Sequence, residues 1–213
     1  MFGLPQSTEL NRQLPKKSIY SKFRLNTADR TKFDADIRKL TIVGEISPAT
    51  INIAAGESVA VFYVVHVTLR NQGYDKKNIA LLSKLIDQNM LFVLEYEGKA
   101  RLAVFRTRLL QSEWLPVQEL NIKLTGLNLD TVWENIIVQV GNVEIEQSRT
   151  LDEQLAVDEE REKLRRQIDR LERQARSEKQ PRRKFELVQQ IKILSNKLSI
   201  DHKAEERGQY EFK

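Results

Sequence analysis

The chain has 213 residues, of which 40% are hydrophobic and 31% are charged, and its formal net charge is +5. This length permits one buried core and an appendage, and the absence of cysteine excludes disulfides, thiol nucleophiles and thiolate metal sites. The longest nearly uncharged apolar run, residues 59–69, is shorter than the roughly 18 residues of a membrane-spanning helix. Residues 1–5 do not have the pattern of a secretory signal. We therefore expect a soluble cytoplasmic protein.

The positive charge is concentrated in two flanking regions. Residues 1–40 contain nine Lys and Arg against four Asp and Glu, and residues 161–184 contain eleven against four. Residues 41–150 are close to neutral, with ten basic and twelve acidic side chains. Such flanks suit a polyanion or an acidic protein face, although a solvated helix surface produces the same composition.

The first half of the chain predicts one helix and two strands. Residues 1–26 contain two prolines and are expected to be irregular. Helical spacing of apolar residues favours a helix over residues 27–40 with Thr27 as its N-cap, followed by a strand over residues 41–46. The β-branched and aromatic run at residues 59–69 is typical of a central strand with both faces covered.

A second helix and a hairpin are predicted next. Asp75 is expected to cap a helix. Residues 90–96 and 100–108 then form two arms around a turn at Glu97–Gly98. Alternation in the second arm indicates one solvated face.

The remainder of the first domain predicts a strand at residues 120–124 and a helix at residues 129–140, with Asp130 as its cap and Gly141 at its end. This order of elements indicates an α+β fold with a mainly antiparallel sheet and helices packed on one face. Apolar density falls after this point, so we assign the α+β core domain to residues 1–146.

Residues 147–203 predict a basic helical hairpin or coiled coil, and residues 204–213 a flexible tail. Pro181 separates two apolar series and is expected to end or kink the first helix. Helices of this length are marginal when isolated, so the pair is expected to pack on the core domain, a second copy or a partner. The two series are Val157, Leu164, Ile168, Leu171 and Ala175, and Leu187, Ile191, Leu194 and Leu198.

Catalytic motifs are weak. Glu97-Gly98-Lys99, with Asp87 upstream, matches the acid and Glu-x-Lys pattern of metal-dependent nucleases. The same residues form the expected hairpin turn, which would point Glu97 and Lys99 into solvent. A divergent nuclease using Asp87, Glu97 and Lys99 therefore stays as an alternative, and the preferred interpretation is that the protein is not an enzyme.

Neither metal ligands nor cofactor motifs are evident. His66 lies within the β-rich run and is expected to be a satisfied core residue, and His202 to be a solvated residue at a helix end. No glycine-rich phosphate loop is present. We therefore expect no metal site and no cofactor.

The basic stretch from Arg161 to Lys184 is the strongest candidate for a binding surface. Arg182, Arg183 and Lys184 follow Pro181 and are expected to project from the bend, where they would meet phosphates. Phe185 would stack on a base or anchor the second helix, and its proximity to the apolar series favours the anchor. The full candidate set, for nucleic acid or a partner, is Arg165, Arg166, Arg170, Arg173, Arg176, Lys179, Arg182, Arg183 and Lys184.

A surface of internal ion pairs is the competing interpretation of this stretch. Glu162 and Arg166, and Asp169 and Arg173, are four residues apart and would pair along the first helix. The sequence alone does not separate these two interpretations.

Four blocks together resemble a known family. They are Gly3-Leu-Pro5, residues 46–52, residues 88–97 and residues 179–187. The chain resembles the prokaryotic family described as domain of unknown function 4391. The resemblance implies an accessory subunit encoded beside a DEAD/DEAH-type helicase and a DNA methyltransferase, in clusters of the restriction and phage-defence type. It implies no catalytic residues.

We therefore expect a non-catalytic accessory protein of a restriction or antiviral-defence assembly. It would bind a helicase or DNA methyltransferase partner, and DNA or RNA through the basic hairpin, without a membrane. A self-associating coiled-coil scaffold, a homodimer through the C-terminal helices, is a further alternative.

The predicted domain boundary can be tested by limited proteolysis. We expect the first cut between Gln147 and Glu160, leaving a folded fragment of residues 1–146, because exposed polar junctions are preferred cleavage sites. Mass spectrometry of the fragments identifies the cut. A first cut within residues 59–104 would show that the domain assignment is wrong.

Overall fold

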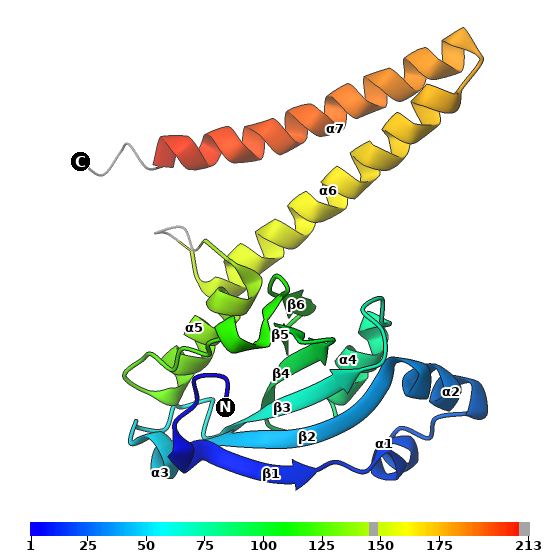
Figure 1. Cartoon of the computed structure of the whole chain (residues 1–213). Helices are drawn as coiled ribbons and strands as arrows, with labels where there is room; N and C mark the ends of the chain where they lie inside the picture. The colour runs from blue at the N-terminus through cyan, green and yellow to red at the C-terminus, as the bar shows by residue number, and fades with distance from the viewer. Residues whose placement is uncertain (145–148, 209–213) are drawn as a thin grey trace. The chain divides into compact units, whose positions relative to one another are not determined.

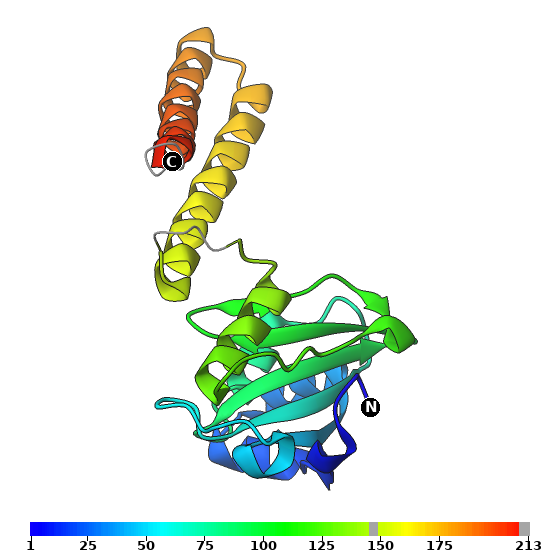
Figure 2. The ribbon, with the colours of Figure 1, turned by 90° about the vertical axis from the view of Figure 1, so that its left-hand side faces the viewer.

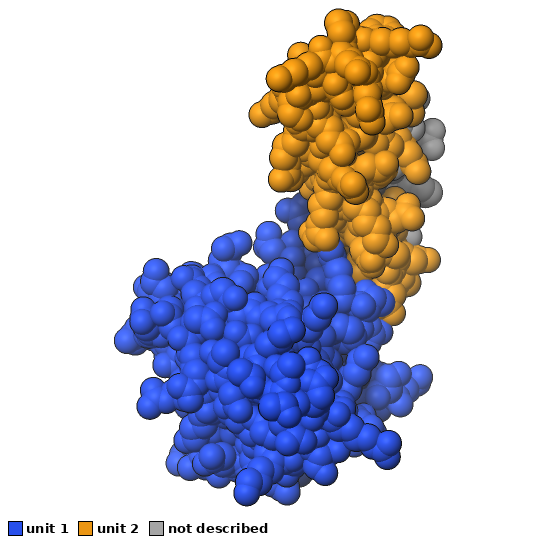
Figure 3. Space-filling model, turned by 90° about the vertical axis from the view of Figure 1, so that its right-hand side faces the viewer, with its two compact units in different colours: residues 1–144 blue, residues 145–213 orange. Residues whose placement is uncertain are grey.

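The computed structural model describes the backbone of residues 1–144 and 149–208, and the side chains up to residue 198. The chain divides into two compact units, Met1–Glu144 and Ile145–Lys213, which Figure 3 colours separately. The boundary expected after residue 146 falls within residues 145–148, outside the described part of the chain. Each unit is described by itself below.

Unit 1 is built on a mixed sheet of seven strands, in which β1 to β6 follow one another in chain order and β7 pairs with β5 (Figure 1). Only the central pair, β3 and β4, is parallel, and the crossover between them contains α4. The predicted α+β fold with a mainly antiparallel sheet is thus confirmed. The strands are β1 (Glu9–Gln13), β2 (Ile37–Ile46), β3 (Phe62–Leu69), β4 (Asn89–Tyr96), β5 (Lys99–Phe105), β6 (Leu109–Gln111) and β7 (Leu115–Pro116).

Helices cover both faces of this sheet, so the expectation of one covered face is wrong. Val65 of β3 belongs to the same buried cluster as Ile19, Phe33 and Ile79 of three helices. Phe62 lies on the opposite face of β3, because successive side chains alternate, and its ring lies 5.0 Å from Trp133 of α5. The helices are α1 (Lys16–Lys22), α2 (Thr27–Asp36), α3 (Pro48–Ile51), α4 (Lys76–Leu82) and α5 (Leu129–Gly141), with short 3₁₀ turns at Gln6–Thr8 and Val117–Glu119.

The first 40 residues are more regular than predicted. They contain β1 and α1, where irregular chain was expected, and the next helix ends at Asp36 because Ile37 already pairs with Leu69 in the sheet. The N-cap of α2 is Asn26, whose side chain accepts the Asp29 N–H, and not Thr27. The missed α1 has only one buried residue, Ile19, and therefore gives no periodic apolar signal.

The hairpin turn at Glu97–Gly98 is confirmed. Both residues have positive φ, +46° and +75°, which is the requirement of a two-residue type I′ turn. The solvated face expected for the second arm is wrong, because Leu102, Ala103 and Val104 are all buried.

The expected strand at residues 120–124 does not form. Leu120 and Ile122 are buried, but the Ile122 N–H donates to the carbonyl of Phe2 at 2.9 Å instead of joining the sheet. Gly3 permits this close approach, since it has φ +78° and an added Cβ would lie 1.9 Å from Asn121 Oδ1. A hydrogen bond to the N-terminal segment thus takes the place of pairing with a strand of the sheet.

Asp130 does not cap its own helix but clamps a distant loop. The N-cap of α5 is Asn128, whose side chain accepts the Thr131 N–H. The Asp130 carboxylate accepts the main-chain N–H groups of residues 57–59, at 2.7 Å from Glu57 and 2.8 Å from Val59. A Cβ on Gly56 would lie 2.2 Å from Asp130 Oδ1, so the loop needs glycine there.

Unit 2 consists of two long helices, α6 (Leu151–Ser177) and α7 (Pro181–Gly208), which are in contact and meet at a bend, from which they spread apart in Figure 1 (Figures 1 and 2). The predicted helical hairpin is therefore present. Pro181 is the first residue of α7, where its missing N–H has no helical partner to lose, and α6 ends four residues earlier, at Ser177. The proline thus starts the second helix and does not break the first.

The Asp130 clamp generates a stability prediction. We expect Asp130→Asn to lower the free energy of unfolding by about 2 kcal/mol, because the amide offers fewer acceptor sites and no charge to the three N–H groups. Urea unfolding followed by circular dichroism measures this change. Glu134→Gln, at an exposed position of the same helix, is the matched control and should leave stability unchanged. Equal stability of both variants with the native protein would contradict the clamp.

Candidate nucleic-acid interface

The bend between α6 and α7 is a three-residue connection held by Glu178. The Glu178 carboxylate accepts the main-chain N–H of Gln180 at 2.9 Å and pairs with Arg183 at 3.7 Å. The Lys184 N–H returns to the Gln180 carbonyl at 2.9 Å. These bonds order the tip of the hairpin and fix the direction in which α7 begins.

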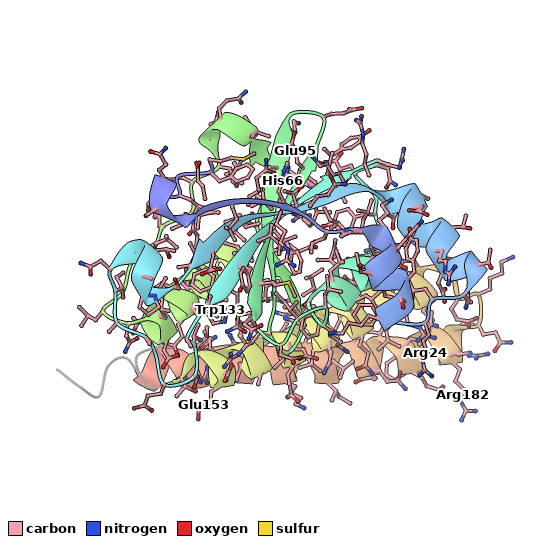
Figure 4. The ribbon with its side chains drawn as sticks, turned by 90° about the horizontal axis from the view of Figure 1, so that it is seen from below. Arg24, His66, Glu95, Trp133, Glu153 and Arg182 are labelled. Carbon is pink, nitrogen blue, oxygen red and sulfur yellow. The ribbon has the colours of Figure 1, made fainter. Side chains whose placement is uncertain are left out.

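Three consecutive cations occupy the first turn of α7. Arg182, Arg183 and Lys184 are all exposed, and the Arg182 side chain, 95% exposed, extends away from the helix in Figure 4. Arg182 lies 3.6 Å from Glu186. An ion pair this exposed contributes little, so a phosphate can replace the carboxylate at small cost. The structure thus places these three residues at the tip, where the sequence predicted them.

The arginines of α6 are exposed as well, and some of them are paired. Arg166 contacts Glu162, as predicted, and Arg176 lies 3.5 Å from Glu172. Arg173 donates to the main-chain carbonyl of Asp169 at 3.2 Å and not to its carboxylate. The ion pair predicted for Arg166 is therefore confirmed and that of Asp169 with Arg173 is wrong, while the binding interpretation stays a prediction. Within the part of the chain whose side chains are described, the candidates without a carboxylate partner include Arg165, Arg170, Lys179 and Lys184.

The two helices of the hairpin differ in the charge at their N-termini. The first turn of α6 contains Asp152 and Glu153, and the hydrogen bonds from the main chain and hydroxyl of Thr150 hold the pKa of Glu153 below its usual value. The first turn of α7 contains no acidic residue. A helix N-terminus carries a partial positive charge, so three cations there create a strongly positive end that attracts anions.

Phe185 does not anchor the second helix, and that prediction is wrong. Its side chain is 64% exposed, whereas the less exposed face of α7 begins at Leu187 and continues through Ile191 and Leu194. The signal was present in the sequence, because Phe185 lies two residues before Leu187 and so outside the four-three-four spacing of the apolar series. An exposed aromatic ring therefore adjoins the cations of the tip.

The residues of the nuclease alternative do not converge. Asp87 precedes β4 and Glu97 follows it, so the whole strand separates them, a rise of about 25 Å for eight residues. Glu97 lies in the hairpin turn, Lys99 follows it, and both are exposed. Over residues 1–144 and 149–198, no group of three His, Asp or Glu side chains is arranged to hold a metal ion.

His66 has a partner within the sheet. Its Nε2 lies 2.6 Å from Glu95 Oε2 on the neighbouring strand (Figure 4), and its ring meets Phe2 edge-on with 5.5 Å between centroids. The expectation of a satisfied residue in the core is consistent with this contact. The side chain of His202 lies outside the described residues.

Comparisons with known proteins place the chain in a family. No helix of the described part is long and apolar enough to cross a membrane. No curated protein and no solved structure matches the chain. One family model, Domain of unknown function (DUF4391), matches residues 2–198, which include both the sheet of unit 1 and the basic tip. The chain therefore belongs to the DUF4391 family.

Proposed function

We propose that this protein is a non-catalytic accessory subunit that contacts nucleic acid through the basic tip of its C-terminal hairpin. The observation that carries the proposal is the run of three exposed cations, Arg182, Arg183 and Lys184, in the first turn of α7. Exposed arginines along α6 add further positive charge to the hairpin.

The placement of these cations argues for a ligand. Cations at a helix N-terminus interact unfavourably with the helix dipole, and stability alone favours Asp or Glu there, as at the start of α6. A bound phosphate group offsets this unfavourable interaction, because its negative charge is attracted both to the positive side chains and to the N–H groups of the first turn. A binding role thus explains why three cations are placed here although only two of them, Arg182 and Arg183, pair with a carboxylate.

The protein partner is proposed from the family resemblance. Members of the family are expected beside a DEAD/DEAH-type helicase and a DNA methyltransferase in restriction and phage-defence clusters, enzymes that act on nucleic acid. We propose that the sheet domain docks on one of these enzymes while the hairpin adds a contact to its nucleic-acid substrate. Co-purification of a tagged copy from its native host tests this docking.

Charge removal at the tip tests the nucleic-acid contact. We expect the triple variant Arg182→Ala, Arg183→Ala, Lys184→Ala to weaken DNA or RNA binding at least about tenfold and to flatten its salt dependence. The slope of log K against log salt should fall by about one for each lost phosphate contact. Fluorescence anisotropy titrations at several salt concentrations measure both quantities.

A second triple variant controls for net charge. Lys76→Ala, Lys99→Ala, Lys123→Ala removes the same charge from exposed positions of unit 1, and we expect it to bind almost as well as the native protein. Circular dichroism should show unchanged helical content for both variants, because the apolar series of α6 and α7 is intact. Native protein that binds no nucleic acid even at low salt would overturn the proposal.

The non-catalytic part of the proposal has its own test. Incubation of the purified protein with plasmid DNA and magnesium or manganese should leave the plasmid intact, because Asp87 and Glu97 lie at opposite ends of β4. Gel electrophoresis shows any nicking or linearisation. Metal-dependent cleavage that disappears in Glu97→Ala would replace this proposal with the nuclease.

A further inference from the structure

One face of α7 combines cations with exposed apolar side chains. Phe185 is 64% exposed and Val188, one turn further on, is 47% exposed. Arg182 precedes Phe185 by three residues and Lys192 follows it by seven, so at 3.6 residues per turn all four lie on one side of the helix. We call Arg182, Phe185, Val188 and Lys192 the outer stripe of α7. The apolar residues Leu187, Ile191 and Leu194 occupy the other side of the helix, at half-buried positions.

We infer that the nucleic acid bound by the hairpin tip is single-stranded, and that an unpaired base stacks on Phe185 while Arg182 holds an adjoining phosphate. This inference rests on the proposed function and adds the class of nucleic acid to it. The sugar-phosphate chain would follow the outer stripe toward Lys192.

The exposed ring of Phe185 is the reason for inferring a single strand and not a duplex. In a duplex the faces of the bases are covered by their neighbours, and only phosphates, sugars and base edges are accessible to a protein. A phenylalanine ring has no hydrogen-bonding group with which to read an edge, whereas it stacks on the free face of any unpaired base. Proteins that bind single strands without sequence preference combine stacking aromatics with a positively charged track, and both occur together on the outer stripe.

The charge around Phe185 disfavours a second copy of the chain as the occupant. The cations Arg182, Arg183 and Lys184 immediately precede the ring, and the one carboxylate of the first two turns, Glu186, faces Arg182 at 3.6 Å. A twofold contact through Phe185 and Val188 would bring the two positive tips together, because such an interface pairs the same patch from both subunits. A single strand of nucleic acid is negatively charged and is therefore attracted to the same surface.

Substitution of Phe185 separates stacking from charge. We expect Phe185→Leu to weaken the binding of a short single-stranded oligonucleotide about tenfold, in both DNA and RNA forms, while a blunt-ended two-strand duplex of equal phosphate number is bound as by the native protein. The salt slope should stay unchanged, because no charge is removed. Phe185→Trp should restore binding, and its fluorescence, measured against the native background of Trp114 and Trp133, should be quenched by the single strand.

Ile193 supplies the matched control. It is 67% exposed on the same helix but lies eight residues, more than two turns, beyond Phe185, so Ile193→Ala should bind both oligonucleotides as the native protein does. Equal helical content of all variants by circular dichroism excludes unfolding as the cause of any loss.

The outcomes separate this inference from the proposed function. Native protein that binds neither oligonucleotide overturns both. Native protein that binds duplex and single strand alike, with no effect of Phe185→Leu on either, overturns the single-strand inference and leaves the charged contact standing. A native dimer in analytical ultracentrifugation that Phe185→Leu dissociates would assign the ring to self-association and would also overturn the inference.

Discussion

The apolar seam between α6 and α7 is the interaction on which the candidate site depends. Neither helix would hold its position alone, because isolated helices with so polar a surface are marginal in water. We attribute their pairing to the apolar series that is half-buried on both helices, Leu164, Ile168 and Leu171 on α6 and Ile191 and Leu194 on α7. Pairing in turn brings the connection of residues 178–180 to one end and leaves the first turn of α7 in solvent. The position of the cations is thus a consequence of packing several turns away from them.

Unit 1 depends on a different constraint, the burial of its central strands on both faces. The parallel pair β3 and β4 is covered on one side by α1, α2 and α4 and on the other by α5. A sheet covered in this way needs connections that reach both faces, and these are held by single polar groups such as Asp130 and by the N-terminal segment around Gly3. The small contacts are therefore as necessary as the large buried residues, since they position the covering elements.

The two units also differ in what their charges do. Several polar and charged groups of unit 1 are engaged in structural contacts, as in the ion pair of Lys16 with Asp34 and the contact of His66 with Glu95. Burial raises the pKa of Asp34, but the hydrogen bonds and charge of Lys16 together with the Tyr20 hydroxyl lower it on balance, so this carboxylate remains ionised and holds α1 to α2. At the tip of unit 2, the pair of Arg182 with Glu186 is exposed on both sides, and only Glu178, which pairs with Arg183, is half-buried. Charge that is not used for folding is available for a ligand.

The sequence by itself determined the features that depend on local backbone chemistry. The turn at Glu97–Gly98 is signalled by Gly98, which adopts positive φ without a steric penalty. The start of α4 follows from the capping side chain of Asp75, and the apolar spacing of α6 and α7 follows from 3.6 residues per turn. The tertiary structure alone decided what depends on partners distant in the chain. Asp130 lies 71 residues from Val59, whose N–H it accepts, residues 120–124 pair with Phe2 instead of the sheet, and Phe185 faces solvent because the helix phase is set by the seam from Leu187 onward. Local patterns specify which elements form, and only the packing of the elements decides which side chains remain free to bind.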